Sequence, residues 1–323
     1  MQIHKITYYI INTLTYLFFY CIVIDILIAY LNVMNINIYT LDEISKTYEN
    51  IEDHLSTRQI IRKFSQNKND IRLLSLELCN LSHYNNILDL GCGYGFFTEA
   101  LNNRIASGAC ITGVDVIGGE NKRMFLSTCV QSGYNAQFIE DSAHIICNIP
   151  DNTYDCVIAS YSLYFFPDLI NHIARILTND GTFIALTHSE LTLSQITSIF
   201  IESIHHVIPL SDSSLHIAKL FKSFSAENGF VQLQPYFDYI MYLRYPNNLI
   251  FKSSDIDHCI SYIHKKQYLF FKDIALLDSD EHDALINDFY NRLRWHVSSY
   301  KDFIVNKDDA IFIARNPVKQ INE

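Results

Sequence analysis

The chain has 323 residues, a formal net charge of −11, 49% hydrophobic residues and 18% charged residues. This composition is typical of a globular protein and excludes one that is largely disordered. Because the excess of acidic residues would repel a phosphate backbone, we expect no nucleic-acid substrate.

An apolar segment comes first in the chain. Residues 6–31 carry one full charge, Asp25, and are long enough to cross a bilayer as a helix. We expect residues 1–33 to be either a membrane anchor or an upstream artefact in front of a start at Met34, with a buried helix as a third interpretation. An anchor would tether an otherwise cytoplasmic protein to a membrane.

Residues 34–82 follow with a helical pattern. Apolar residues recur at helical spacing, for example at Ile44, Tyr48 and Ile51, and charged residues lie between them. This spacing predicts an N-terminal helical cap.

Residues 83–323 begin with a regular alternation of apolar strands and amphipathic helices. The expected strands read NNILDL, ACITGVDV, AQFIED, YDCVIAS and GTFIALTH. Such alternation is typical of βαβ units, whose right-handed crossovers place the strands in parallel. We therefore predict an α/β fold with a mostly parallel sheet.

The regular alternation of strands and helices becomes less clear after Thr187. We expect one helix at 193–207 and a second at 214–228 that ends at Gly229 as a helix C-cap. The segment 231–245 then alternates like a long strand.

Residues 255–295 are largely helical in pattern, and the sequence AIFIAR at 310–315 closes as a last strand. These patterns predict helical insertions at about 190–213 and 250–303, ahead of the last strand.

The eight cysteines are scattered and form no Cys-x-x-Cys pair. We interpret them as buried, reduced thiols of a cytosolic protein. The adjacent His205 and His206 lack the spacing of metal ligands and have no cysteine near them in the sequence, so we predict no metal site.

The most informative stretch is ILDLGCGYGFF, an expected strand that ends at Asp89 and runs through Gly91, Gly93 and Gly95 into a helix. Glycine lets a backbone approach a ligand closely at the carboxyl edge of a sheet, where open α/β folds bind their ligands. Phe96 stands where a dinucleotide-binding turn has its third glycine. This spacing disfavours a nicotinamide dehydrogenase.

The next two expected strands end in acidic residues. Asp115 follows about one βα unit after the glycines, where its carboxylate can accept hydrogen bonds from both hydroxyls of a ribose. The third strand ends in Glu140, Asp141 and Ser142, which suit an adenine amino group. The pattern therefore indicates a ligand that contains adenosine.

At this point the chain resembles the class I S-adenosylmethionine-dependent methyltransferases, especially the small-molecule branch that includes ubiquinone and menaquinone biosynthesis enzymes. The matching segments are ILDLGCGYGFFTEAL, ITGVDV, FIEDSAHI, YDCVIASYSLYFFPD and GTFIAL. The resemblance implies a Rossmann-like sheet that an antiparallel strand pair closes, which the segments 231–244 and 310–315 would supply. The bulky Glu140-Asp141 and the long insertion depart from the family pattern and leave the substrate class open.

The resemblance also implies S-adenosylmethionine as the cofactor. The positions that correspond to the cofactor site are Asp89, Gly91, Cys92, Gly93, Gly95, Asp115, Val116, Asp141, Ser142 and Ser160. Asp89 has two interpretations, a structural carboxylate beneath the cofactor and a direct contact, and Cys92 is expected to pack.

The acceptor is expected beyond the ends of the fourth and fifth strands. His188 ends the fifth strand and is interpreted either as a catalytic base or as a satisfied polar residue, and Tyr164 is a second catalytic candidate. The neighbouring Tyr161, Phe165 and Phe166 form either a plain hydrophobic wall or part of the acceptor pocket.

The expected function is methyl transfer to an oxygen, nitrogen or carbon atom of a small organic acceptor. In-line displacement at a sulfonium asks the protein mainly for orientation and desolvation, which agrees with the lack of a visible catalytic triad. Two alternatives stand beside it: a non-catalytic nucleotide-binding or interaction module on the same fold, and a protein methyltransferase.

Overall fold

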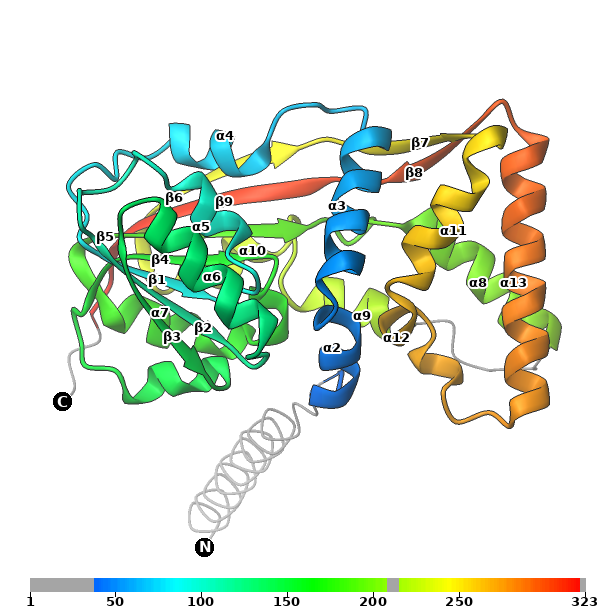
Figure 1. The fold of residues 1–323 in the computed structure, drawn as a ribbon, viewed down its shortest axis with the longest axis horizontal. Coiled ribbons are helices and arrows are strands. Elements are labelled where there is room, and N and C mark those ends of the chain that lie inside the picture. Colours follow the sequence, from blue (N-terminus) through cyan, green and yellow to red (C-terminus); the bar gives the residue numbers. More distant parts are fainter. Residues whose placement is uncertain (1–37, 208–214, 320–323) are drawn as a thin grey trace, which may run out of the picture. The chain divides into compact units, whose positions relative to one another are not determined.

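The computed structural model describes residues 38–207 and 215–319, as Figure 1 shows. The apolar segment 6–31 and Met34 lie outside the described residues, so the interpretations of that segment stay predictions. Within the described residues, no helix is both long enough and apolar enough to cross a membrane.

A seven-stranded sheet with the order β3-β2-β1-β4-β5-β9-β6 organises the described residues. The strands from β3 to β5 pair in parallel, whereas β9 runs antiparallel to both of its neighbours, β5 and β6. The strands are β1 (Asn86–Leu90), β2 (Cys110–Asp115), β3 (Asn135–Glu140), β4 (Tyr154–Ser160), β5 (Leu177–His188), β6 (Phe237–Tyr245) and β9 (Asp309–Pro317). The predicted Rossmann-like fold class, with its antiparallel last strand, is confirmed.

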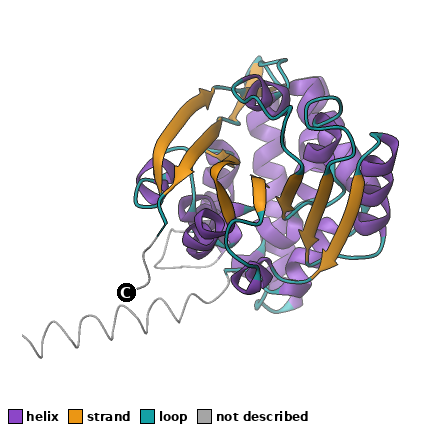
Figure 2. Cartoon of the chain, turned by 90° about the vertical axis from the view of Figure 1, so that its left-hand side faces the viewer, coloured by secondary structure: helices purple, strands orange, loops and turns teal. Residues whose placement is uncertain are grey.

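The central strands are apolar on both faces because helices flank the sheet (strands orange and helices purple in Figure 2). In β1, for example, Ile87, Leu88 and Leu90 are all 0% exposed. The helices that connect these strands are α5 (Phe96–Ala100), α6 (Glu120–Gln131), η1 (Ala143–Asn148), η2 (Leu163–Phe165), η3 (Pro167–Leu169) and α7 (Ile170–Ile176). Parallel strands also place all their carboxyl ends at one edge, where the predicted site residues lie.

The predicted cap segment forms three helices, α2 (Leu41–Tyr48), α3 (Ile51–Phe64) and α4 (Ile71–Glu77). A short polar side chain accepts a hydrogen bond from a first-turn backbone N–H at the start of each helix: Thr40, Asn50 and Asp70. These caps explain why three short helices form in succession instead of one long helix.

The helical insertion predicted at 250–303 also contains strands, so that prediction needs a correction. Strand β7 (Asn248–Lys252) lies at the start of the predicted insertion and β8 (Asp302–Asn306) at its end, and the two strands pair antiparallel. Figure 1 shows β6 leading into β7 and β8 leading into β9, as two neighbouring ribbons that reach the helices. Each strand has only five residues, too few for the alternation to stand out beside a helical segment.

Helices α8 (Ser194–Val207), η4 (Ser253–Asp255), α11 (Ile256–His264) and α13 (Ser279–Ser299) contact this strand pair. The remaining helices of this region are α9 (His216–Ser223), which follows the first predicted insertion, and α12 (Gln267–Phe270) and η5 (Lys272–Ile274) in the second. Ion pairs join them to the cap: Lys272 pairs with Glu43 at 2.6 Å, and Lys265 pairs with Asp53 at 2.5 Å. The cap and the insertion therefore form one connected layer beside the sheet.

The cysteines only partly follow the prediction of buried thiols. Those in the described residues are free, and Cys92, Cys129, Cys156 and Cys259 are buried. Cys147 is exposed, which contradicts the prediction for that residue. It lies in the 3₁₀ helix η1 at the surface, outside the apolar strands on which the prediction depended.

Gly229 does not end a helix, contrary to prediction. Helix α9 already ends at Ser223, and Gly229 is the first residue of another short helix, α10 (Gly229–Leu233), which occupies the start of the segment predicted as a strand. Glycine stands here because of packing: an added Cβ would lie 2.8 Å from the ring of Phe312 and 3.0 Å from that of Phe224.

We therefore predict that Gly229→Ala destabilises the fold. Alanine gains about 0.5–1 kcal/mol over glycine within a helix, but overpacking against two fully buried rings costs about 1–3 kcal/mol, so the clash dominates. Denaturant unfolding should show a lower midpoint. The penalty should shrink in a Phe312→Leu background, and an equal penalty in both backgrounds would contradict the packing explanation.

Candidate active site

Three glycines shape the loop between β1 and α5. Gly91, Gly93 and Gly95 have φ angles of +74°, +50° and +78°, in the left-handed region that glycine tolerates best. An added Cβ would lie 2.4 Å from the Cβ of Ser162 at Gly91 and 3.2 Å from the backbone of Phe125 at Gly95, but would meet nothing within 4 Å at Gly93. The loop is therefore packed at its first and third glycines and open at the second.

Asp115, at the end of β2, braces this loop. Its Oδ2 accepts a hydrogen bond from the N–H of Gly93 at 2.8 Å, and its Oδ1 accepts one from the N–H of Ile117 at 2.9 Å. Burial raises the pKa of this carboxyl group, and the two N–H donors oppose the shift. Each carboxylate oxygen keeps a second lone pair that a ligand hydroxyl can use.

Asp89 lies beneath the loop and is 1% exposed. The hydroxyl of Thr98 donates to its Oδ2 at 2.7 Å, while Oδ1 has no hydrogen-bond partner among the described residues. Burial raises the pKa of Asp89 to about 7, and the nearby Asp115 adds to the shift. This placement supports the structural interpretation of Asp89. Cys92 is also buried, as expected of a packing residue.

The other predicted cofactor residues lie at the neighbouring strand ends. The N–H of Asp141 donates to the carbonyl of Asp115 at 3.1 Å, so the ends of β2 and β3 are held together. Ser142 is exposed and caps η1 through the N–H of His144. Val116 is 37% exposed, and Ser160 is half-buried at the end of β4. The ten predicted residues thus lie along one edge of four adjacent strands.

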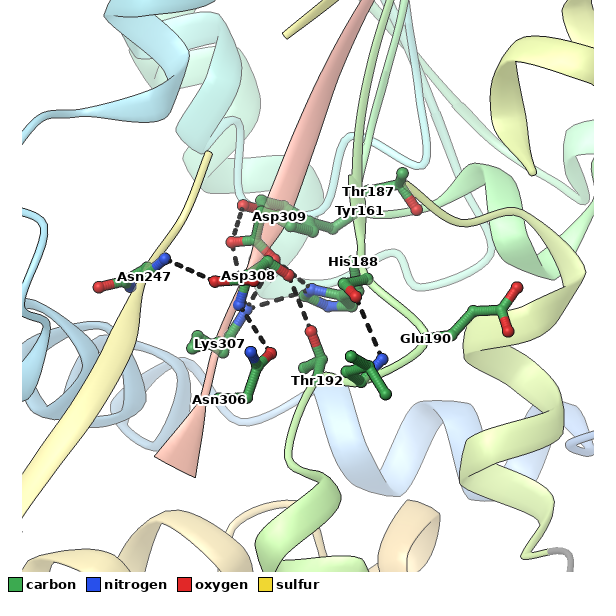
Figure 3. A network of polar contacts seen from close by, with 12 residues as sticks. Tyr161, Thr187, His188, Glu190, Thr192, Asn247, Asn306, Lys307, Asp308 and Asp309 are labelled. Carbon is green, nitrogen blue, oxygen red and sulfur yellow. Dashed lines mark hydrogen bonds and ion pairs between the residues drawn. The ribbon is translucent and has the colours of Figure 1, made fainter. Parts of the chain in front are cut away.

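A network of buried polar side chains occupies the same edge at β4, β5 and β9 (Figure 3). His188, the last residue of β5, is paired across the sheet with Asp309, the first residue of β9. Its Nδ1 lies 2.7 Å from Oδ1 of Asp309, and the hydroxyl of Tyr161 donates to Oδ2 of the same carboxylate at 2.8 Å. Lys307 lies 3.0 Å and 3.3 Å from the two carboxylate oxygens.

The network fixes the protonation of His188. Lys307 also lies 3.1 Å from Nδ1, but an ammonium can only donate, and both Asp309 oxygens are within its reach. We therefore assign the Nδ1 proton to the bond with Asp309, which leaves Nε2 as the acceptor nitrogen. Burial lowers the pKa of His188, Lys307 adds to this effect and Asp309 opposes it. Although burial opposes ionisation of Asp309, Lys307 and His188 hold its pKa below the usual range.

Aromatic rings surround the imidazole of His188. The ring of Tyr164 stacks on it at 5.7 Å between centroids, Tyr161 lies at 4.7 Å, and Phe221 of α9 meets it edge-on at 5.0 Å. Burial raises the pKa of both tyrosines well above the ordinary value, so neither hydroxyl ionises near neutral pH. Tyr164 can therefore orient or donate, but it cannot act as the base.

Tyr161 has an unusual backbone conformation, with a φ of +56°. A non-glycine residue in this region costs about 1–3 kcal/mol and persists only where its surroundings hold it. Here its N–H donates to the carbonyl of Leu186 and its hydroxyl donates to Asp309. With this backbone conformation the chain turns sharply after β4, and the Tyr161 ring lies beside His188.

The sequence analysis missed Asp309 and Lys307, which complete the network. A signal was present, because Lys307, Asp308 and Asp309 directly precede the strand predicted at 310–315. An antiparallel strand starts at the edge where its parallel neighbours end, so a polar group at its first residue falls beside the end of β5. Within the described ranges, no group of His, Cys, Asp and Glu side chains gathers closely enough to hold a metal ion.

Comparison with known protein families identifies the kind of domain that contains this sheet edge. The profile of a family described as "Methyltransferase domain" matches residues 87–181, which contain the glycine loop, Asp115 and the ends of β3 and β4. Residues 87–181 are a methyltransferase domain. It is of the class I, S-adenosylmethionine-dependent kind, and S-adenosylmethionine is its cofactor. No curated protein matches the chain.

Several solved structures are similar to the chain. The YcgJ protein of Bacillus subtilis is 16% identical with a TM-score of 0.46, and the match covers 75% of this chain and 98% of that one. Phosphoethanolamine N-methyltransferase 2 of Haemonchus contortus is 13% identical with a TM-score of 0.44, over 82% of this chain and 57% of that one. The cyclopropane synthase MmaA2 of Mycobacterium tuberculosis is 12% identical with a TM-score of 0.40, over 76% and 82%.

The residues of the methyltransferase domain fit the cofactor. The open side of Gly93 leaves room for a ligand against the loop backbone, and Asp115 presents carboxylate oxygens with remaining acceptor capacity at the next strand end. Val116, Asp141 and Ser142 are accessible beyond it, where an adenine would lie.

We predict that Asp115→Ala and Gly93→Ala both weaken binding of S-adenosylmethionine. Losing two ribose hydrogen bonds at about 0.5–1.5 kcal/mol each should lower affinity about 5- to 150-fold, and a Cβ at Gly93 would enter the open space beside the loop. Isothermal calorimetry with the purified chain measures both effects.

Two matched controls accompany this measurement. Asp155 also holds backbone N–H groups, those of Asn85 and Asn86, but at the opposite edge of the sheet. Gly108 has a φ of +73° and open space around it, away from the loop. Asp155→Ala and Gly108→Ala should leave the affinity unchanged, and equal losses in all four variants would contradict a specific site.

Proposed function

We propose that this methyltransferase domain methylates an oxygen, nitrogen or carbon atom of a small organic acceptor, with His188 as the base where a proton must be removed. The observation that carries the proposal is the His188–Asp309 pair, 2.7 Å apart, at the same sheet edge as the cofactor loop. When bound, S-adenosylmethionine supplies an electrophilic methyl group on a positively charged sulfur.

The network prepares His188 for proton removal. With the Nδ1 proton held by Asp309, Nε2 is left to accept a proton from an acceptor hydroxyl. Because its pKa is lowered, the imidazole is neutral near pH 7 and therefore competent as a base. The Asp309 carboxylate then stabilises the imidazolium that forms, in the way that a buried carboxylate supports other catalytic histidines.

The burial of His188 supports a small acceptor. Its side chain is 14% exposed, and the rings of Tyr164 and Phe221 pack against it. Such enclosure favours a small molecule, which needs only a narrow opening, over a side chain on a folded protein surface. Enclosure by aromatic rings also removes water from the acceptor, which favours a displacement at a sulfonium.

The acceptor branch follows from the sequence resemblance. The likeness to the ubiquinone and menaquinone methyltransferases makes phenolic hydroxyls and activated ring carbons the first acceptors to test. The aromatic rings of Tyr161, Tyr164 and Phe221 offer planar apolar faces that suit such an acceptor.

We expect His188→Ala to lower turnover of a hydroxyl acceptor about 10²- to 10⁴-fold while cofactor affinity stays nearly unchanged. Tyr164→Phe should cost less, because this hydroxyl does not act as the base. Release of S-adenosylhomocysteine, measured with a panel of small phenols, amines and carbon acids, gives the rates. Turnover of His188→Ala within a factor of about two of wild type on every hydroxyl acceptor would leave orientation and desolvation as the whole mechanism.

Asp309 is expected to act as a positioning residue, and its effect should appear in the pH profile. Because the pKa of His188 is lowered, kcat/KM should fall on acidification only below about pH 6.5, the ordinary value for histidine. Asp309→Asn removes the charge that favours imidazolium, so this acidic limb should move to lower pH and the plateau should drop. A limb that stays in place would contradict the proposed coupling.

A further inference from the structure

Three lysines of the second insertion lie against the cap helices, and two of them have acidic partners. Lys265 pairs with Asp53 of α3, and Lys272 pairs with Glu43 of the helix α2. Lys266, between them, forms no ion pair with any carboxylate of residues 38–207 and 215–319; its Nζ lies 4.2 Å from the ring centroid of Tyr48. The molecule therefore holds one half-buried ammonium over an aromatic face, without a counter-ion among the described residues.

The surroundings disfavour the charge on Lys266. Burial lowers its pKa to about 7, with Asp53 opposing the shift and Lys265 adding to it. A cation–π contact with Tyr48 compensates only part of the desolvation of an ammonium. The nearby His54 does not share the charge, because burial and Lys266 lower its pKa to about 3.

Lys266 also lies beside Tyr48 and His54, and these two residues lead to the two halves of the candidate site. On one side, Tyr48 lies close enough to Tyr164 for each side chain to affect the pKa of the other, and the ring of Tyr164 stacks on His188 at 5.7 Å. On the other side, the ring of His54 lies 5.3 Å from that of Tyr48 and 5.1 Å from that of Tyr94.

Tyr94 stands between Gly93 and Gly95 in the cofactor loop, and its hydroxyl donates to the carbonyl of Tyr48 at 3.0 Å. One aromatic cluster thus connects the cofactor loop, the candidate base and the unpaired ammonium. The cap helices contribute Tyr48 and His54 to this cluster, which gives them a place in the site that the sequence analysis did not assign.

We propose that Lys266 binds an anionic oxygen group, a phosphate or a carboxylate, on the methyl acceptor while the reacting end of the acceptor lies near His188. This inference rests on the proposed function, because it concerns the acceptor of the same site. An anion at this position supplies the counter-ion that Lys265 and Lys272 already have, and it would favour the charged amine over the neutral one. The acceptor class is therefore an aromatic or otherwise apolar molecule with one anionic end.

The test uses the full chain saturated with S-adenosylhomocysteine and three probes of similar size: phenyl phosphate, benzoate and the neutral benzyl alcohol. Calorimetric titration should show that at least one anion binds about tenfold or more tightly than benzyl alcohol. Lys266→Met should remove that preference, and Lys266→Arg, which keeps the charge, should retain part of it. Lys265→Met is the matched control and should keep the preference. Whichever anion binds more tightly identifies a phosphate or a carboxylate as the group bound.

Three results would overturn the proposal. Benzyl alcohol could bind as tightly as both anions, Lys266→Met could keep the full preference, or Lys265→Met could lose it equally, which would indicate a general effect of charge. Failure of the wild-type chain to bind S-adenosylhomocysteine at all would overturn the proposed function together with this inference. Binding of S-adenosylhomocysteine without any preference for the anions would overturn the role of Lys266 alone.

Discussion

The carboxylate of Asp309 is the constraint on which the candidate site depends. It is 5% exposed and interacts with Tyr161 after β4, His188 at the end of β5 and Lys307 before β9. A buried charge costs several kcal/mol unless it is paired, and breaking such a pair costs about 3–5 kcal/mol. The ends of three strands are therefore held in one arrangement, and the strained backbone of Tyr161 persists because its side chain is part of it.

The two candidate carboxylates of the sheet edge are opposite in electrostatic character. Among the described residues, Asp115 accepts hydrogen bonds only from backbone N–H groups, and burial raises its pKa, so a further donor such as a ligand hydroxyl would stabilise its charged form. Asp309 is paired with Lys307 and His188, which lower its pKa, so its carboxylate interacts with groups of the protein. Environments that push similar groups apart in this way often separate a binding role from a catalytic one.

The features that could be predicted from the sequence depend on local patterns, whereas the predictions that were missed or wrong depend on contacts between distant segments. The glycine loop and the placement of Asp115 beside it were predictable because they follow from a strand, a turn and a spacing within one βα unit. The partner of His188 was not, because Asp309 is 121 residues away in the sequence and meets it only through the register of β5 with β9. The prediction for Gly229 was wrong for a similar reason, since one of the two rings that require a glycine there, that of Phe312, belongs to the distant strand β9.

The strand order also has a consequence for how the chain is assembled during translation. Strand β6 is made well before β9, yet β9 lies between β5 and β6 in the sheet, and β9 is the one neighbour that β6 has there. The ribosome releases the cofactor loop and Asp115 early, whereas β6 stays unpaired until the final strand emerges. Pairing of β9 completes the sheet and brings Asp309 to His188 in the same step, so the residues of the glycine loop are synthesised well before the network around His188 can form.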